Sequence, residues 1–294
     1  MADIETVIPR MPTPPRHKQP AGATDCHTHV FGPYDRFALV NPPNYAPPEA
    51  PVERHLQMLD IVGNTNGVLV QPAAYGLDTS LMRAAIAASG GRLRGIALGG
   101  PDLSPDDMAM MNAGGIKGLR FVDMLDPQGR PYIGAISAMS VLEMGGRMAD
   151  SGWHPEMWAK LPTHLETIPK LIAAGFGMPI VLDHMAGIDT AKGVNDPDFQ
   201  QLLRHVGNGD VWVKTSLCRQ SSAYPQYAEL KPFHDALVAA NPERLLWGSD
   251  WPYLAMGDAS PDVGVMVDLV HDWVGDEGVV QRIFVANPAE VYDF

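Results

Sequence analysis

The sequence predicts an α/β fold, a (β/α)8 TIM barrel of about 250 residues preceded by a proline-rich N-terminal tail. Eight short apolar stretches resemble buried strands, and nearly every one is followed by a segment with helical spacing, at intervals of about 25–35 residues. No change of composition marks a second domain in the 294 residues. Because this alternation implies parallel strands joined by right-handed crossovers, we expect a single barrel domain over residues 23–294.

The tail is predicted over residues 1–22. Its prolines oppose regular secondary structure, and its basic side chains keep it hydrated. We expect the tail to lie across the barrel or against a neighbouring subunit. The prolines in question are Pro9, Pro12, Pro14, Pro15 and Pro20.

The predicted strands are short runs rich in apolar residues, bounded by glycine, proline or polar residues. The second, from Gly67 to Gln71, is almost uninterrupted, as burial on both faces of a parallel sheet requires. The fifth strand has the weakest pattern. In chain order we expect strands at residues 23–30, 67–71, 93–98, 116–122, 155–160, 179–184, 211–216 and 244–250.

Helix signals fill the intervals between these strands. Val52, Leu56 and Leu59 recur with helical spacing, and Ser104 followed by Pro105 and two acidic residues is a strong N-terminal signal. Asp78 can cap a second helix, and a Thr163–Glu166 capping box can start a later one in which Pro169 produces a kink. Asn287-Pro288 opens a last turn after the final helix. In chain order we expect helices at 52–62, 79–89, 104–114, 133–151, 163–175, from Asp196-Pro197 through Val206, within 226–240, at 261–274 and at 276–286.

Composition excludes some functions. A net charge of −13 argues against a general binder of nucleic acid or anionic membranes, although a local basic pocket for an acidic substrate remains compatible with it. The two cysteines, Cys26 and Cys218, form no disulfide pattern, and neither a membrane-spanning run nor the apolar segment of a signal peptide is visible. We therefore expect a cytoplasmic protein, with a homo-oligomer as an open possibility.

Chemically useful side chains fall at the predicted carboxyl ends of the strands, where the active site of such a barrel lies. His27 and His29 end the first strand and, by alternation, point to the same side. Two imidazoles there can bind a divalent cation or polarise an oxygen atom. The residues expected at this rim are His27, His29, Gln71, Arg120, Trp158, His184, Lys214 and Asp250.

Four motifs support a resemblance to the amidohydrolase superfamily, in its second large branch: Asp25 to Pro33, Val181 to Met185, Trp247 to Pro252 and Ala286 to Tyr292. Within that branch the chain is most similar to the 2-pyrone-4,6-dicarboxylate lactonases and to related lactonases such as the 4-sulfomuconolactone hydrolases. The resemblance covers about residues 20–294 and implies a barrel of the metal-dependent-hydrolase type.

The resemblance implies that the chain hydrolyses an anionic lactone of the pyrone dicarboxylate, muconolactone or sulfomuconolactone type, in the catabolism of aromatic compounds. Asp250 would activate water, and His27, His29 and His184 would polarise the carbonyl group, directly or through a metal ion. It implies either no cofactor or one divalent metal, most readily zinc, on His27, His29, His184 and Asp250. The implied substrate-binding residues are Arg120, Arg219, Tyr45, Gln71, Lys214, Arg130 and Trp158.

Some residues depart from the pattern of the family. Lys214 occupies the seventh strand where a further metal ligand is sought, which argues against a two-metal site. Trp158 stands where a tyrosine is expected, and Pro72-Ala73 replaces a polar pair. Two alternatives stay open: a zinc-dependent decarboxylase of an aromatic or unsaturated acid, in which Asp250 protonates a carbanion, and a binding protein built on a barrel that has lost catalysis.

Overall fold

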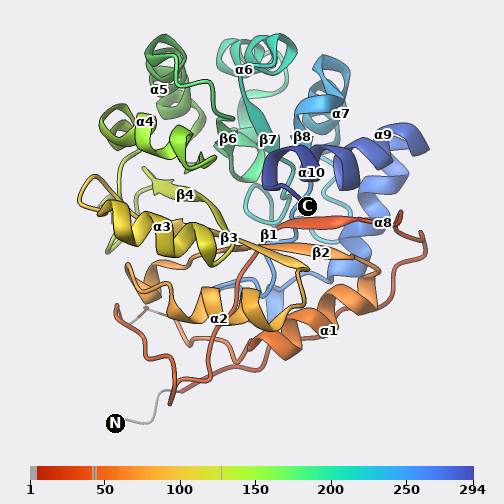
Figure 1. Cartoon of the computed structure of the whole chain (residues 1–294). Coiled ribbons are helices and arrows are strands. Elements are labelled where there is room, and N and C mark those ends of the chain that lie inside the picture. The colour runs from red at the N-terminus through yellow and green to blue at the C-terminus, as the bar shows by residue number, and fades with distance from the viewer. Residues whose placement is uncertain (1–4, 42, 44, 127) are drawn as a thin grey trace.

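The computed structural model describes residues 5–41, 43, 45–126 and 128–294. Its eight strands form one parallel sheet in the order β1 to β8, and Figure 1 shows the helices arranged around them. Backbone hydrogen bonds between the first strand and the segment after the last close the ring: Cys26 N–H donates to the Trp247 carbonyl (2.9 Å), and Asp250 N–H donates to the His27 carbonyl (2.8 Å). The predicted (β/α)8 barrel is confirmed.

The first half of the barrel follows the prediction closely. The helix over 52–62 and the strands over 93–98 and 116–122 have the predicted bounds. The Ser104 hydroxyl accepts a hydrogen bond from the Asp107 amide (3.1 Å) and so caps its helix as expected. The elements are β1 (Thr24–Thr28), α1 (Val52–Val62), β2 (Asn66–Val70), α2 (Ser80–Ala88), β3 (Leu93–Leu98), α3 (Pro105–Ala113) and β4 (Ile116–Val122).

In the middle of the chain, several predicted bounds are wrong. Helix α4 (Val141–Asp150) follows a short 3-10 turn, so residues 133–137 are not helical. Strand β5 (His154–Trp158) ends before Lys160. Helix α5 (Leu161–Ala174) starts directly after Lys160, because Pro162 suits a first turn that needs no N–H donor there. The Thr163–Glu166 capping box therefore does not form, and α5 continues through Pro169.

The last three strands are shorter than predicted. The chain leaves the sheet early at their carboxyl ends, and the residues beyond stay buried beneath the loops, so the apolar runs look longer than the strands. The predicted helix over 276–286 is divided by a π-helical turn at 282–286. The elements are β6 (Val181–Leu182), α6 (Pro197–Asn208), β7 (Trp212–Lys214), α7 (Lys231–Ala240), β8 (Leu245–Leu246), α8 (Val263–Val274), α9 (Glu277–Gln281) and α10 (Asn287–Tyr292).

Helix α10 lies close to the C-terminus (Figure 1), and the contacts of the residue after it place it at the amino-terminal end of the barrel, near the start of β3 and of β4. Arg94 on β3 donates to the Asp293 carbonyl (2.7 Å), and Lys117 on β4 forms an ion pair with the Asp293 carboxylate (2.8 Å). Tyr292 is fully buried in a small cluster with side chains such as Val68 and Val70 of β2. The end with the predicted catalytic residues is therefore the opposite, carboxyl end.

The N-terminal segment lies across the body of the protein. Arg16 contacts Asp268 (3.2 Å) and Asp272 (2.7 Å) on α8, and His17 also contacts Asp272 (2.8 Å). Gly264 lets the tail approach α8 closely, because a Cβ atom there would lie 2.0 Å from the Thr13 carbonyl oxygen. Among the described helices, none has the length and apolar character needed to cross a membrane.

Candidate active site

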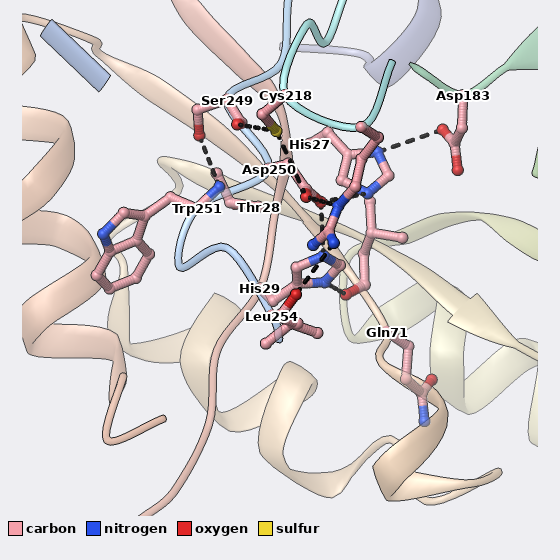
Figure 2. Close-up of polar contacts among 12 residues, drawn as sticks. His27, Thr28, His29, Gln71, Asp183, Cys218, Ser249, Asp250, Trp251 and Leu254 are labelled. Atoms are coloured by element: carbon pink, nitrogen blue, oxygen red, sulfur yellow. Dashed lines mark hydrogen bonds and ion pairs between the residues drawn. The ribbon is translucent and has the colours of Figure 1, made fainter. Parts of the chain in front are cut away.

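His27 and His29 meet Asp250 at the carboxyl end of the barrel. The Nε2 atom of His29 lies 3.2 Å from Asp250 Oδ1, and the Nε2 atom of His27 lies 3.6 Å from the same oxygen. Both imidazoles therefore lie close to one carboxylate oxygen, on the same side of the strand, as the His-x-His spacing predicts. They do so although the pairing of β1 with β2 shifts register between Asp25 and Thr28. Figure 2 shows both rings beside Asp250.

The backbone is strained where it presents the site. His184 has a φ of 49° and Asp250 a φ of 67°, both in the left-handed region that disfavours residues with a Cβ atom. The ring centroid of His184 lies 4.6 Å from that of His27. Gly248 is required for the approach of β1, because a Cβ atom there would lie 2.6 Å from the Cβ of His27. Such strain is typical of functional sites.

A buried ionic layer lies beneath these residues. Lys214 forms an ion pair with Glu156 of β5 and a second with Asp183 Oδ1 (3.2 Å), and all three side chains are fully buried. Asp183 Oδ1 also lies 3.2 Å from His27 Nδ1. The Tyr292 hydroxyl donates to Glu156 (2.6 Å) from the amino-terminal side. The layer therefore connects the carboxyl end of the barrel with α10.

Lys214 stays charged in this layer. Burial alone would lower its pKa, but Asp183 and Glu156 together raise it. In the same way burial would raise the pKa of Glu156 and of Asp183, but Lys214 lowers both, together with His154 for Glu156 and with His184 and Arg120 for Asp183. The structure places Lys214 against these carboxylates rather than in the cavity, where the sequence suggested a substrate contact.

Sequence reasoning missed Glu156 and gave Asp183 no definite role. One signal was available: Glu156 is two residues before Trp158 on the same strand, so alternation places it on the inner face. A second was the lysine on a strand of the barrel, because a buried ammonium group requires carboxylate partners.

A cavity of about 260 Å³ opens above His29, His184 and Asp250. The other chemically active residues that line it come from different strand ends and loops, and the predicted ones among them are Tyr45, Arg120, Trp158 and Arg219. Seven of the predicted site residues, counted from the lining of this cavity, are therefore brought together. His27 is fully buried directly behind them.

Two predicted residues lie elsewhere. The Gln71 amide group donates to the carbonyls of Gly76 and Asp78 (both 2.9 Å) and accepts from the Leu98 amide (2.9 Å), so it holds the loop after β2. Arg130 has a side chain that is 71% exposed and forms an ion pair with Asp126 (2.8 Å). It lines an adjoining cavity, which shares Tyr45 and Tyr132 with the first.

Arginines control the charge of the site. Arg219 Nε donates to Asp250 Oδ2. Burial opposes ionisation of Asp250, but Arg219, the His29 hydrogen bond and His184 outweigh it and hold its pKa well below the usual range. Burial lowers the pKa of His27, with Lys214 adding to the effect, and burial together with His27 lowers that of His184. The site thus contains an ionised carboxylate beside the buried imidazoles of His27 and His184, whose pKa values burial lowers.

The family model for amidohydrolases matches residues 24–294 of this chain. The chain belongs to the amidohydrolase family. The match spans the whole barrel and includes all the motifs on which the sequence resemblance rests, so the expected family is confirmed.

Curated relatives of this amidohydrolase match it over nearly its full length. It is 35% identical to the 4-sulfomuconolactone hydrolase of Rhizobium radiobacter, covering 93% of this chain and 90% of that one. It is 30% identical to the 2-pyrone-4,6-dicarboxylate hydrolase of Comamonas testosteroni, covering 96% and 93%. A solved structure from Acinetobacter baumannii, a probable 2-pyrone-4,6-dicarboxylic acid hydrolase with citric acid bound, has a TM-score of 0.78 and 26% identity, covering 93% and 100%.

The amidohydrolase has donor atoms that fit one divalent metal ion. His29 Nδ1 contacts the Val70 carbonyl oxygen (2.7 Å), which can only accept, so Nδ1 carries a proton. Nε2 then faces Asp250 Oδ1 at 3.2 Å, where either a proton on Nε2 or a bound divalent ion joins the two atoms. His27, His29 and Asp250 have ligand atoms within 4.8 Å of one another, a typical set for such an ion.

A second group of possible ligands, His27, Asp183 and His184, is less suited to a metal. The Asp183 carboxylate already has two cationic partners, Lys214 at 3.2 Å and Arg120 at 3.7 Å. A divalent ion would have to compete with both of them. This arrangement agrees with the expectation of at most one metal ion.

Proposed function

We propose that this amidohydrolase opens the ring of an anionic lactone by attack of water on the ester carbonyl. The observation that carries the proposal is the convergence of Asp250, His27 and His29 at the base of a cavity that also contains arginine side chains. The two curated relatives named above are hydrolases whose names specify a sulfomuconolactone and a pyrone dicarboxylate. They favour hydrolysis over the alternative of decarboxylation.

In this mechanism Asp250 is the general base. Its position at the cavity floor and its ionised state allow it to take a proton from a water molecule during attack. When the C–O bond of the tetrahedral intermediate breaks, the protonated Asp250 returns the proton to the leaving oxygen, and the product is a hydroxy or enol acid. Arg219 orients the carboxylate by binding its other oxygen.

The imidazoles stabilise the oxyanion of the intermediate. His184 lines the cavity, and its Nδ1 has no hydrogen-bond partner among the described residues. A neutral imidazole carries one N–H group, which His184 can donate to the developing oxyanion. A divalent ion held by His27, His29 and Asp250 would supply Lewis-acid polarisation of the carbonyl when bound.

The remaining cavity residues bind the substrate. Arg120 offers its guanidinium fork to an acidic group, and Trp158 offers an aromatic face beside it, with the guanidinium carbon 5.2 Å from the ring centroid. Tyr45 lies on the opposite loop, where burial raises the pKa of its hydroxyl group to about 12. At neutral pH this hydroxyl is an uncharged donor toward the substrate.

The test is a panel of anionic lactones, followed with a pH indicator on protein of measured metal content. Opening of at least one lactone, with a loss of about 10³-fold or more in kcat on Asp250→Asn, supports the proposal. Failure to open any lactone with or without added zinc contradicts it, as does release of carbon dioxide from an unsaturated acid.

A further inference from the structure

The charges around the cavity limit the number of acidic groups that a substrate can carry. We propose that the enzyme prefers a monoanionic lactone, with one carboxylate bound by Arg120 and an otherwise uncharged, largely apolar body. This inference rests on the proposed lactone hydrolysis. It differs from what the name of the pyrone dicarboxylate relative specifies, since that substrate has two carboxylates.

The first observation is the small number of cations. Among the described residues that line the cavity, Arg120 and Arg219 are those with a positive charge. Arg130 lines an adjoining cavity instead, where it forms an ion pair with Asp126 (2.8 Å). Lys214 is fully buried below the cavity and is bound to Glu156 and Asp183.

Arg219 is committed to the catalytic base. Its Nε donates to Asp250 Oδ2, and its Nη1 donates to the Leu254 carbonyl (3.0 Å). Moving it toward a substrate anion would leave Asp250 buried without its strongest cationic partner, and such a separation is costly. Arg219 is therefore a poor second anchor for an acidic group.

Arg120 is held much more loosely. Its Nη1 is 3.4 Å from the Gln71 carbonyl, its Nε is 3.7 Å from Asp183 Oδ2, and Nε makes no hydrogen bond within the described chain. The side chain is 8% exposed, so water satisfies little of it. A guanidinium group with free donors in a buried setting is suited to bind one carboxylate with two hydrogen bonds.

Most of the remaining wall is apolar. Leu98 and Val122 come from the ends of β3 and β4, and the positions where the family pattern suggested a polar pair are Pro72 and Ala73. A second carboxylate placed against these residues would lose its hydration without gaining a partner. The further apolar lining residues are Ala135, Leu254 and Ala255.

The charge balance leads to the same result. Three cations and three carboxylates pair within the cavity and the ionic layer: Lys214 with Glu156, Arg120 with Asp183, and Arg219 with Asp250. Burial raises the pKa of the nearby Asp25 to about 7, so this residue adds less than a full negative charge near neutral pH. Asp183 keeps Lys214 as its nearer cation (3.2 Å), so Arg120, at 3.7 Å, can bind one substrate carboxylate. A monoanion is then compensated by Arg120, whereas a dianion brings one further charge that has no partner.

The experiment compares three matched 2-pyrones on the full-length enzyme: one uncharged, one with a single carboxylate and one with two. The expected kcat/KM of the monocarboxylate exceeds that of each of the others by about tenfold or more. A dicarboxylate that is turned over as well as or better than the monocarboxylate overturns the inference.

A pair of variants tests whether Arg120 is the residue that binds the carboxylate of the substrate. Arg120→Gln is expected to lower kcat/KM for the monocarboxylate by about 10²-fold, mainly through KM, and to lower that of the uncharged pyrone by much less, so that the ratio of the two values falls by about tenfold or more. Arg204→Gln, an exposed arginine on α6, removes the same charge far from the cavity and should change neither. Equal losses for both pyrones in Arg120→Gln would mean a structural role and overturn the assignment.

The inference can fail separately from the proposed function. If no pyrone is hydrolysed, the function fails, and calorimetric binding of benzene monocarboxylate and benzene-1,3-dicarboxylate still tests the charge preference. Tighter binding of the monocarboxylate supports the inference, and equal or tighter binding of the dicarboxylate contradicts it.

Discussion

In the proposed mechanism Asp250 must meet two requirements that usually conflict. A general base must be ionised, and it must also accept a proton readily. Arg219 contributes to the first by stabilising the charged carboxylate, and together with His29 and His184 it outweighs the effect of burial and keeps the pKa of Asp250 low. The same contact weakens Asp250 as a base, so the rate should respond strongly to the identity of residue 219.

Replacing Arg219 should therefore move the pH profile. Because Arg219 favours the ionised form, Arg219→Gln is expected to raise the pKa of Asp250 and shift the acid limb of kcat/KM upward by about one pH unit or more. Arg219→Lys keeps a positive charge and should shift the limb less. The profile is measured between pH 4 and 9, and an acid limb that stays in place in Arg219→Gln contradicts this role.

Lys214 should matter for stability more than for substrate binding. Lys214→Met leaves two buried carboxylates without their cation, and about 3–5 kcal/mol of unfolding free energy should be lost in a urea titration. Lys231→Met is the control, because Lys231 contacts Asp235 on an exposed face of α7, and it should change stability by less than about 0.5 kcal/mol. Equal effects of the two substitutions would mean that the buried layer is not a unit.

At the scale of the element, the sequence predicts the strands better than it predicts their ends. The strands at 93–98 and 116–122 are found correctly because their apolar runs end at polar or glycine residues as the strands do. Strands β6 to β8 are overestimated because the chain turns out of the sheet while remaining buried. Positive φ angles at His184, after β6, and at Asp250, after β8, lie in these turns, and no hydrophobic pattern reveals them.

For the candidate site, too, the sequence predicts part of the arrangement: which residues lie at the strand ends, but not all of the contacts that they make. Residues at strand ends, such as His27 and Asp250, could be placed together from the barrel rule alone. The pairing of Lys214 with Glu156 depends on the distance between two strands across the barrel, and the exclusion of Arg130 depends on the path of a loop. Neither is encoded in local spacing.

Gly248, just after β8, offers a test of how closely the first and last strands must approach. Gly248→Ala would place a Cβ atom 2.6 Å from the Cβ of His27, so His27 must move away from Asp250. We expect kcat to fall by about tenfold or more with little change in KM. Gly146→Ala in α4 meets no atom within 4 Å and should leave activity unchanged while slightly stabilising the helix. Normal activity in Gly248→Ala would show that the approach is not needed.

For the molecule as a whole, buried histidines set the response to acid. Burial lowers the pKa of His55 to about 3 and of His164 and His234 to about 4, and it also lowers those of His27 and His184. Each is neutral in the folded state over a range where the unfolded chain, with a histidine pKa near 6.5, takes up protons. The stability they contribute is therefore complete above about pH 6.5 and declines as the pH falls toward 4.

Asp25 acts in the opposite sense and moderates this loss. Burial raises its pKa to about 7, so the folded state keeps a proton that the unfolded chain releases above about pH 4. The stability that Asp25 contributes is therefore greatest below about pH 4 and falls as the pH rises from 4 to 7. Five histidines outweigh one aspartate between pH 6.5 and 4, and the melting temperature should fall across this range.

His234 separates this effect from general acid sensitivity. Its two ring nitrogens make no hydrogen bond to the described residues, and its side chain is fully buried against Trp273 at a centroid distance of 5.3 Å. His234→Leu should therefore keep the fold at pH 7.5 and flatten the fall in melting temperature between pH 6.5 and 4.5, since one proton-uptake site of the unfolded chain is gone. His17→Gln, which removes a partly exposed histidine from the tail, should leave that slope almost unchanged. If the melting temperature of both variants falls with pH as steeply as that of the parent protein, the acid response does not come from the buried histidines.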